Sequence, residues 1–170
     1  MPYRRTFYHL IWATRGREPL IVPGMHDALE RSIRATGQEH HALVHAVGIM
    51  PDHVHVVISI PPSIAVSTLI GRLKGSSSHL LNNRGPMTDG VPFAWQGEYG
   101  VLSFHEKDLA GVMDYVNNQP ARHAAGRLST TMESLGEDRS PLQGALSVER
   151  GAFTPASGRR HITTANDTAP

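Results

Sequence analysis

Residues 48–60 read GIMPDHVHVVISI, a short turn followed by an apolar run that ends before Pro61-Pro62. Such a run of Val and Ile is typical of a buried strand. Side chains alternate between the two faces of a strand, so we expect His53 and His55 to share one face and Val54 to lie on the other. Two imidazoles at this spacing hold one metal ion if a third ligand is supplied. Otherwise they are polar residues on the solvated face of the strand.

Length and composition indicate one globular domain with a hydrophobic core. The chain has 170 residues, of which 39% are hydrophobic and 18% charged, and it has no cysteine. Disulfides and thiolate metal sites are therefore excluded. No apolar run approaches the roughly 20 residues that a membrane span requires, and the N-terminus lacks the apolar core of a signal peptide. We therefore expect a cytoplasmic protein with no membrane segment.

Charge is distributed unevenly along the chain, although the net charge is only +1. Residues 1–85 hold nine Lys/Arg against five Asp/Glu, and residues 86–170 hold seven against ten. The first half therefore offers a modest surface for an anionic ligand, unless its cations are simply scattered over the surface. The candidate cations are Arg4, Arg5, Arg15, Arg17, Arg72, Lys74 and Arg84.

Hydrophobic periodicity and turn residues predict an α+β fold. Strands are expected at residues 3–14, 40–49, 53–60 and 93–104, and helices at 23–36, 64–81 and 106–118, with a short helical stretch at 122–135. This β-α-β-β-α-β order is that of a ferredoxin-like antiparallel sheet with helices on one face, here followed by a C-terminal helix that carries Tyr115. We expect the domain to span residues 1–136 and residues 137–170 to form a polar tail, disordered or loosely attached.

Polar residues interrupt the second predicted helix at Lys74-Gly75-Ser76-Ser77-Ser78. They fit a solvated helix face. They also fit a surface that approaches a phosphate backbone through Lys74 and hydroxyls such as that of Ser76. The sequence alone leaves both alternatives open.

Tyr115 and Gln119 lie four residues apart near the end of the third predicted helix. At this spacing two side chains are neighbours on one helix face, so a phenolic hydroxyl and an amide oxygen can reach the same point. A tyrosine hydroxyl acts as a covalent nucleophile when a positive centre stabilises the charge. Alternatively, the ring of Tyr115 only anchors the helix. Pro120 disfavours helical geometry at Gln119, so we expect the helix to end there.

Several motifs together resemble one family of proteins. They are His53-Val54-His55 after Met50-Pro51-Asp52, Trp95-Gln96, Tyr115 with Asn118-Gln119, the opening residues 8–14 (YHLIWAT) and residues 122–126 (RHAAG). The set resembles the single-tyrosine HUH transposases of bacterial insertion sequences, of the insertion-sequence-200-like type, with the REP-associated tyrosine transposases as relatives. The resemblance covers about residues 3–135.

The resemblance implies an enzyme that cuts and rejoins single-stranded DNA at element ends. Tyr115 would attack a DNA phosphate and form a 5′-phosphotyrosine link, while His53, His55 and Gln119 would hold a divalent ion, Mg²⁺ or Mn²⁺. The implied partners are single-stranded DNA with subterminal hairpins and a second copy of the chain. Arg4, Arg15, Arg17, Arg72, Lys74 and Ser76 are the candidate DNA-binding residues.

Two other functions stay open at this point. One is a binding module that grips hairpin nucleic acid without cutting it. The other is a metal-dependent nuclease that uses water, with Tyr115 as a structural residue.

Overall fold

The computed structural model describes residues 5–84 and 92–135, so the predicted tail at 137–170 and its boundary lie outside the described residues. The predicted ferredoxin-like topology is confirmed, because four strands form one antiparallel sheet in the order β2-β3-β1-β4. The strands are β1 (Phe7–Ala13), β2 (Leu43–Ile49), β3 (His53–Ser59) and β4 (Gly100–Phe104). The helices α1 (His26–Glu39) and α2 (Val66–Arg84) provide the two connections of the β-α-β-β-α-β order.

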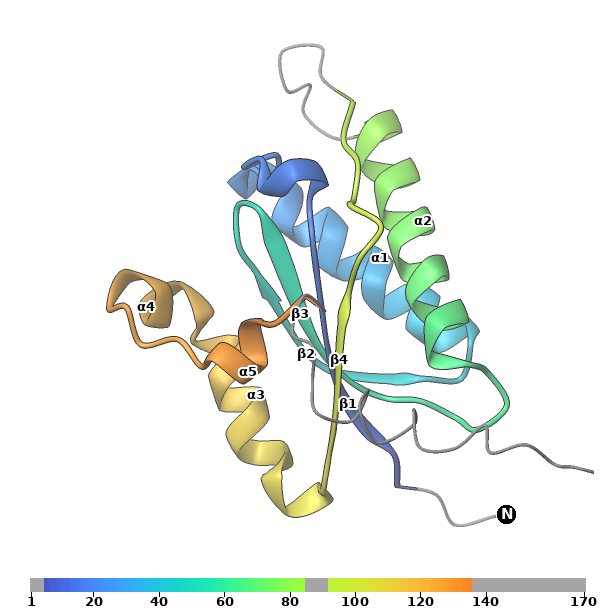
Figure 1. Ribbon diagram of the computed structural model, residues 1–170. Helices are drawn as coiled ribbons and strands as arrows, with labels where there is room; N and C mark the ends of the chain where they lie inside the picture. The colour runs from blue at the N-terminus through green and yellow to red at the C-terminus, as the bar shows by residue number, and fades with distance from the viewer. Residues whose placement is uncertain (1–4, 85–91, 136–170) are drawn as a thin grey trace, which may run out of the picture. The chain divides into compact units, whose positions relative to one another are not determined.

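Each face of the sheet is covered by a different set of helices (Figure 1). Helices α1 and α2 cover one face, and α3 (Leu109–Asn117) packs on the other against β2 and β3. The larger hydrophobic core lies under α1 and α2, and contains Leu10, Trp12, Val54, Val56 and Ile58 from the central strands. A smaller cluster lies under α3 and consists of the buried residues Ala46, Val57, Tyr115 and Val116.

Strand β1 runs through the middle of the sheet, between β3 and β4. The sequence predicts this place, since a strand that is apolar on both faces is usually central. Leu10 and Trp12 enter the larger core, as the alternation predicts. His9 and Ile11 are buried on the opposite face.

Several element boundaries differ from the predicted ones. Residue 36 is the predicted end of the first helix, but α1 continues through Gly37 to Glu39. A β-carbon at Gly37 would lie 2.9 Å from Val44 Cγ2, so the glycine permits close helix–sheet packing and does not act as a stop. Helix α2 extends to Arg84, beyond the predicted loop start at Asn82.

The segment before β4 is mostly not a strand. Only Gly100–Phe104 pairs with β1, and Trp95 makes an isolated bridge to Thr14. Two backbone hydrogen bonds flank this bridge, from Gln96 N–H to Ala13 O and from Arg15 N–H to Ala94 O. Lys74 adds further support, because its Nζ donates to the carbonyl oxygens of Gln96 (2.5 Å), Gly97 (3.0 Å) and Glu98 (3.4 Å).

Three helices follow β4. A short 3-10 turn (Glu106–Asp108), capped by the His105 side chain, leads into α3, and α4 (Gln119–Ala124) and α5 (Thr130–Glu133) follow. The predicted stretch at 122–135 is thus two short helices, the first beginning at Gln119. Among the described residues no helix has both the length and the apolar character needed to cross a membrane.

Candidate functional site

The two histidines of β3 are buried on the sheet face that carries α3. His53 is 1% exposed and His55 is fully buried, so they are not a solvated pair on the strand. The Nδ1 atom of His53 lies 2.6 Å from Asp52 Oδ1, and that of His55 lies 2.9 Å from His9 Nε2. Both Nε2 atoms are buried and without a hydrogen-bond partner in the described part of the chain. Each imidazole is therefore oriented by a partner on its Nδ1 atom, and the Nε2 atoms of both rings face the same side.

His9 is the partner that orients His55. The two rings stack with their centroids 5.0 Å apart and an interplanar angle of 4°. Burial, with the neighbouring His55, lowers the pKa of His9 to about 3. A neutral His9 can accept a hydrogen bond from the Nδ1–H of His55, and this fixes the tautomer in which Nε2 of His55 carries the lone pair. Such outer partners of metal-binding histidines fix ring orientation and raise basicity.

The substitution His9→Leu is expected to weaken divalent-metal binding about 10- to 100-fold, because it removes the acceptor behind His55. His9→Gln keeps a carbonyl acceptor and should retain more of the affinity. Titration of Mn²⁺ against a competing chelator measures both. His45 lies on β2 and bonds Ser59 Oγ at 2.7 Å, so His45→Leu is the matched control. Equal losses in His9→Leu and His45→Leu would contradict the positioning role.

Tyr115 lies beside these histidines. Its ring centroid is 6.3 Å from that of His55, its hydroxyl donates to Glu133 Oε1 at 2.5 Å, and it accepts from the backbone N–H of Ser129 at 3.1 Å. Burial, reinforced by the bond to Glu133, raises the pKa of the Tyr115 hydroxyl, so the hydroxyl is protonated at rest. The guanidinium of Arg122 lies over the ring, 4.8 Å from its centroid.

Gln119 lies at the same site as Tyr115, but it belongs to α4 and not to the helix that carries Tyr115. Helix α3 ends at Asn117, and Gln119 begins α4 with Pro120 in its first turn, where proline is favoured. The Gln119 side chain is fully buried, and its Nε2 lies 3.3 Å from Glu133 Oε1. Its Oε1 is buried without a hydrogen-bond partner among the described residues. The break at Pro120 therefore keeps Gln119 beside Tyr115.

The close approach of α3 to β2 depends on Gly48. A β-carbon there would lie 2.6 Å from the carbonyl oxygen of Val116, the residue after Tyr115, and 3.2 Å from Gln119 Cγ. Backbone atoms cannot yield locally, so any larger residue must displace the end of α3 together with Tyr115.

We expect Gly48→Ala to lower DNA cleavage about 100-fold, because a displacement near 1 Å is enough for that loss. The overpacking should cost about 1–3 kcal/mol of unfolding free energy, with the larger core intact. Cleavage assays and thermal unfolding measure the two effects. Gly111→Ala, in α3, is the control, since a β-carbon there meets no atom within 4 Å. Unchanged cleavage in Gly48→Ala would contradict the tight packing.

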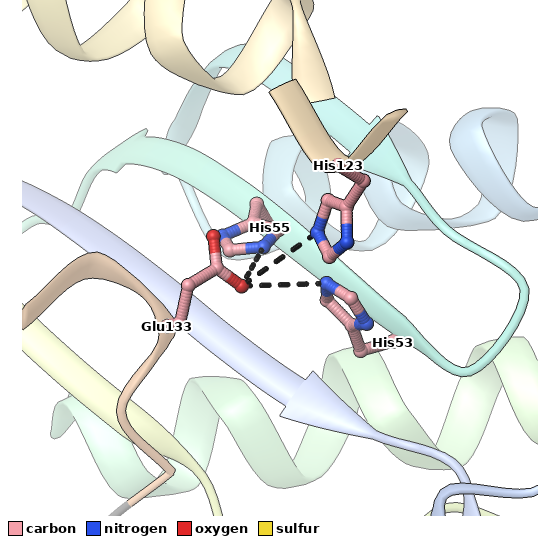
Figure 2. A group of neighbouring side chains, drawn as sticks. All are labelled: His53, His55, His123 and Glu133. Carbon is pink, nitrogen blue, oxygen red and sulfur yellow. Dashed lines mark ion pairs between the residues drawn. The ribbon is translucent and has the colours of Figure 1, made fainter. Parts of the chain in front are cut away.

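Two further residues join the site that the sequence does not single out, His123 of α4 and Glu133 of α5. Glu133 Oε2 lies 3.3 Å from His55 Nε2, 3.6 Å from His53 Nε2 and 3.9 Å from His123 Nε2 (Figure 2). The ligand atoms of all four side chains lie within 4.8 Å of one another. His123 is four residues from Gln119, a spacing that places both on one helix face and was available in the sequence. Nothing local points to Glu133, because only the tertiary fold brings it to the strand.

Electrostatics at Glu133 favour the ionised carboxylate. Burial acts to raise its pKa, but the nearby His55 imidazole and the hydrogen bond from the Tyr115 hydroxyl outweigh burial and lower the pKa to about 2. Burial and the nearby His55 lower the pKa of His53. The site therefore holds a carboxylate facing an uncharged His53, with three unpartnered imidazole nitrogens and one unpartnered amide oxygen around it. Buried polar atoms rarely stay unpaired, and these four have the chemistry of ligands for a divalent metal.

The candidate DNA-binding residues lie in different settings, and Arg17 is linked to the cluster through Asp52, which also bonds His53. Arg15 and Arg72 are exposed, and Arg17 is exposed and bonds Asp52 at 3.2 Å. Lys74 is engaged with residues 96–98, and Ser76 Oγ lies 2.7 Å from Thr36 Oγ1 of α1. Arg4 lies outside the described residues. Their part in DNA binding stays a prediction.

Comparison with known proteins gives concordant relatives. The chain is 28% identical over 115 residues to the ISDra2 transposase TnpA of Deinococcus radiodurans, covering 66% of this chain and 82% of that protein. It is 28% identical over 117 residues to the transposase for insertion sequence element IS200 of Salmonella typhimurium, covering 66% and 75% of the two chains.

Solved structures share the fold. A crystal structure from Deinococcus radiodurans, described as a transposase, aligns with a TM-score of 0.56 at 28% identity, over 70% of this chain and 95% of that one. A REP-associated tyrosine transposase bound to a REP hairpin aligns with a TM-score of 0.54 at 17% identity, over 96% and 99%. The sequence model described as "Transposase IS200 like" matches residues 3–119. The chain therefore belongs to the IS200-like transposase family.

Proposed function

We propose that this transposase cuts and rejoins single-stranded DNA through a covalent link between a DNA 5′ phosphate and Tyr115. One observation carries the proposal. The Tyr115 hydroxyl and the free Nε2 atoms of His53 and His55 converge on one carboxylate, Glu133, which links them within 3.6 Å. A nucleophile and a candidate metal centre therefore lie close enough to act on one phosphate.

Family membership and the His/Glu cluster together indicate use of a divalent metal. In the proposal, His53 and His55 hold it through Nε2 and Gln119 contributes Oε1. When bound, a divalent ion polarises the scissile phosphate and stabilises charge on the leaving 3′ oxygen. Phosphate oxygens supply the remaining ligands, which makes Mg²⁺ or Mn²⁺ suitable.

Tyr115 forms the covalent bond. Its oxygen attacks the phosphorus, the bond to the 3′ oxygen breaks, and the strand leaves with a free 3′ hydroxyl. Because the hydroxyl is protonated at rest, its proton must pass to a base before or during attack, and Glu133 Oε1, which already accepts the hydrogen bond of the hydroxyl, is in place to take it. The departing 3′ oxygen takes up a proton from solvent. The phosphodiester to tyrosine conserves the bond energy, so the reverse attack by a 3′ hydroxyl rejoins DNA without a nucleotide cofactor.

The proposed substrate is single-stranded DNA bearing a hairpin. Support comes from the structural neighbour that was solved bound to a REP hairpin, and from the excess of cations in residues 1–85. A homodimer is part of the proposal as well. The described residues bring Tyr115, His53 and His55 together within a single chain, so this arrangement does not need a second copy to supply the tyrosine.

Covalent trapping tests the proposal. The chain is incubated with a single-stranded hairpin oligonucleotide and Mn²⁺, and the products are separated on a denaturing gel. We expect a protein–DNA adduct that maps by peptide mass spectrometry to the segment containing Tyr115. Cleavage without an adduct would favour attack by water. No cleavage with any divalent ion would favour a hairpin-binding module.

A further inference from the structure

We infer that His123 and Glu133 complete, with His53 and His55, a closed four-ligand site for a transition-metal ion in the DNA-free protein. The inference rests on the proposed function only in taking the histidine pair as metal ligands. It assigns His123 and Glu133 as additional ligands and predicts an ion with four protein ligands. Whether this site binds a metal is independent of whether the protein cleaves DNA.

The distances around Glu133 are those of a tetrahedral site. With metal–ligand bonds of about 2.1 Å, neighbouring ligands of a tetrahedral ion lie about 3.4 Å apart, and those of an octahedral ion about 3.0 Å. The Oε2 atom lies 3.3, 3.6 and 3.9 Å from the three imidazole Nε2 atoms. The longest of these belongs to His123, whose side chain is 26% exposed and has room to close. The four ligand atoms all lie within 4.8 Å of one another, so binding of one ion would draw the more distant pairs together.

The ligand atoms are also available for coordination. The Nε2 atoms of His53, His55 and His123 are buried and have no hydrogen-bond partner among the described residues. The first two are backed by Asp52 and His9 on their Nδ1 atoms, the arrangement of metal-binding histidines. The Glu133 Oε2 atom faces all three.

The donor set selects the class of metal. Three imidazoles and one carboxylate in a tetrahedral arrangement suit Zn²⁺ and its substitute Co²⁺, whereas Mg²⁺ and Mn²⁺ prefer octahedral oxygen ligands and Mg²⁺ retains water. A tetrahedral ion with four protein ligands also has no open position, unlike the usual catalytic metal site. Glu133 is the ligand that a phosphate oxygen would replace, since its second oxygen already bonds the Tyr115 hydroxyl. The ion is then coordinated either by Glu133 or by a DNA phosphate oxygen, and not by both at once.

Cobalt substitution tests the site without DNA. Four-coordinate Co²⁺ absorbs visible light strongly and six-coordinate Co²⁺ weakly. We expect the metal-free chain titrated with Co²⁺ to give the strong spectrum. Glu133→Ala and His123→Ala should each strongly reduce the visible absorbance. Each should also lower the affinity for Co²⁺ by more than the roughly 10- to 100-fold that is typical when a residue hydrogen-bonded to a metal ligand is replaced. His79→Ala and Glu30→Ala, on helices at the other sheet face, are matched controls and should bind as wild type.

Three outcomes overturn the inference. They are no Co²⁺ binding by the wild type, a weak six-coordinate spectrum, and Glu133→Ala and His123→Ala variants that keep both spectrum and affinity. A three-ligand site of His53, His55 and Gln119 would give the six-coordinate spectrum, and that spectrum and the affinity would not change in the Glu133→Ala and His123→Ala variants. Failure of the proposed function looks different, because the adduct would then be missing with Mn²⁺ while the strong Co²⁺ spectrum persists.

Discussion

The Tyr115→Phe variant is expected to form no covalent DNA adduct and to lose at least about 10³-fold in cleavage, because no other group replaces a covalent nucleophile. The substitution removes one oxygen and leaves the ring beside His55 and under Arg122. It also removes the hydrogen bonds to Glu133 and Ser129, at a cost of about 1 kcal/mol each. Cleavage rate, adduct yield and thermal unfolding separate the chemical effect from the structural one.

Tyr99→Phe is the matched control for this experiment. Tyr99 is half-buried near Lys74, whose Nζ lies 5.9 Å from the ring centroid, and the substitution removes the same atom away from the site. The adduct yield and the cleavage rate of Tyr99→Phe should stay at the wild-type level. If Tyr115→Phe still cleaves the hairpin at an appreciable rate, water and not tyrosine attacks the phosphate.

The His53→Ala variant is expected to abolish cleavage while hairpin affinity changes by no more than a few fold. His53 presents its free Nε2 to the site, and removing one ligand of so small a set disables metal binding. DNA affinity depends mainly on phosphate contacts made by cations, which this change leaves in place. A gel-shift assay at fixed salt measures binding, and the trapping assay measures cleavage.

Stability must be followed in the same variant, since His53 is buried and its removal leaves a cavity and takes one of the two side-chain partners of Asp52 away. His45→Ala, on β2 away from the cluster, controls for loss of a sheet histidine and should cleave normally. Parallel loss of cleavage and binding in His53→Ala, with a folded control, would mean that His53 serves the strand and not the chemistry.

Local periodicity predicted the fold well. The alternation in residues 53–59 places Val54, Val56 and Ile58 in the larger core and His53 and His55 on the other face, as expected. The short turn at residues 50–52 defines a hairpin, and the helical stripes place α1 and α2. Boundaries were less predictable. Gly37 looks like a helix stop in sequence, but its environment, the side chain of Val44, is known only from the tertiary contact.

The site was predictable only where its residues are close in sequence. His53 and His55 follow from strand alternation, and Tyr115 and Gln119 from helical spacing, although a break at Asn118 divides that helix in two. Glu133 lies far from His53 and His55 in the sequence, and no local pattern distinguishes it from a surface carboxylate. The roles of Lys74 and Ser76 in DNA binding stay predictions, because both side chains already bond within the protein.

The unequal cores on the two faces of the sheet have a consequence for motion. The face under α1 and α2 carries most of the buried apolar side chains, while α3 rests on a cluster of only four buried residues. Local opening of a structure costs least where few apolar contacts are lost. The layer that carries Tyr115 is thus the one able to detach transiently, with the sheet and its larger core left folded. Amide protons of α3 and α4 would then exchange with solvent ahead of those in β1 and β3, by subglobal rather than global unfolding.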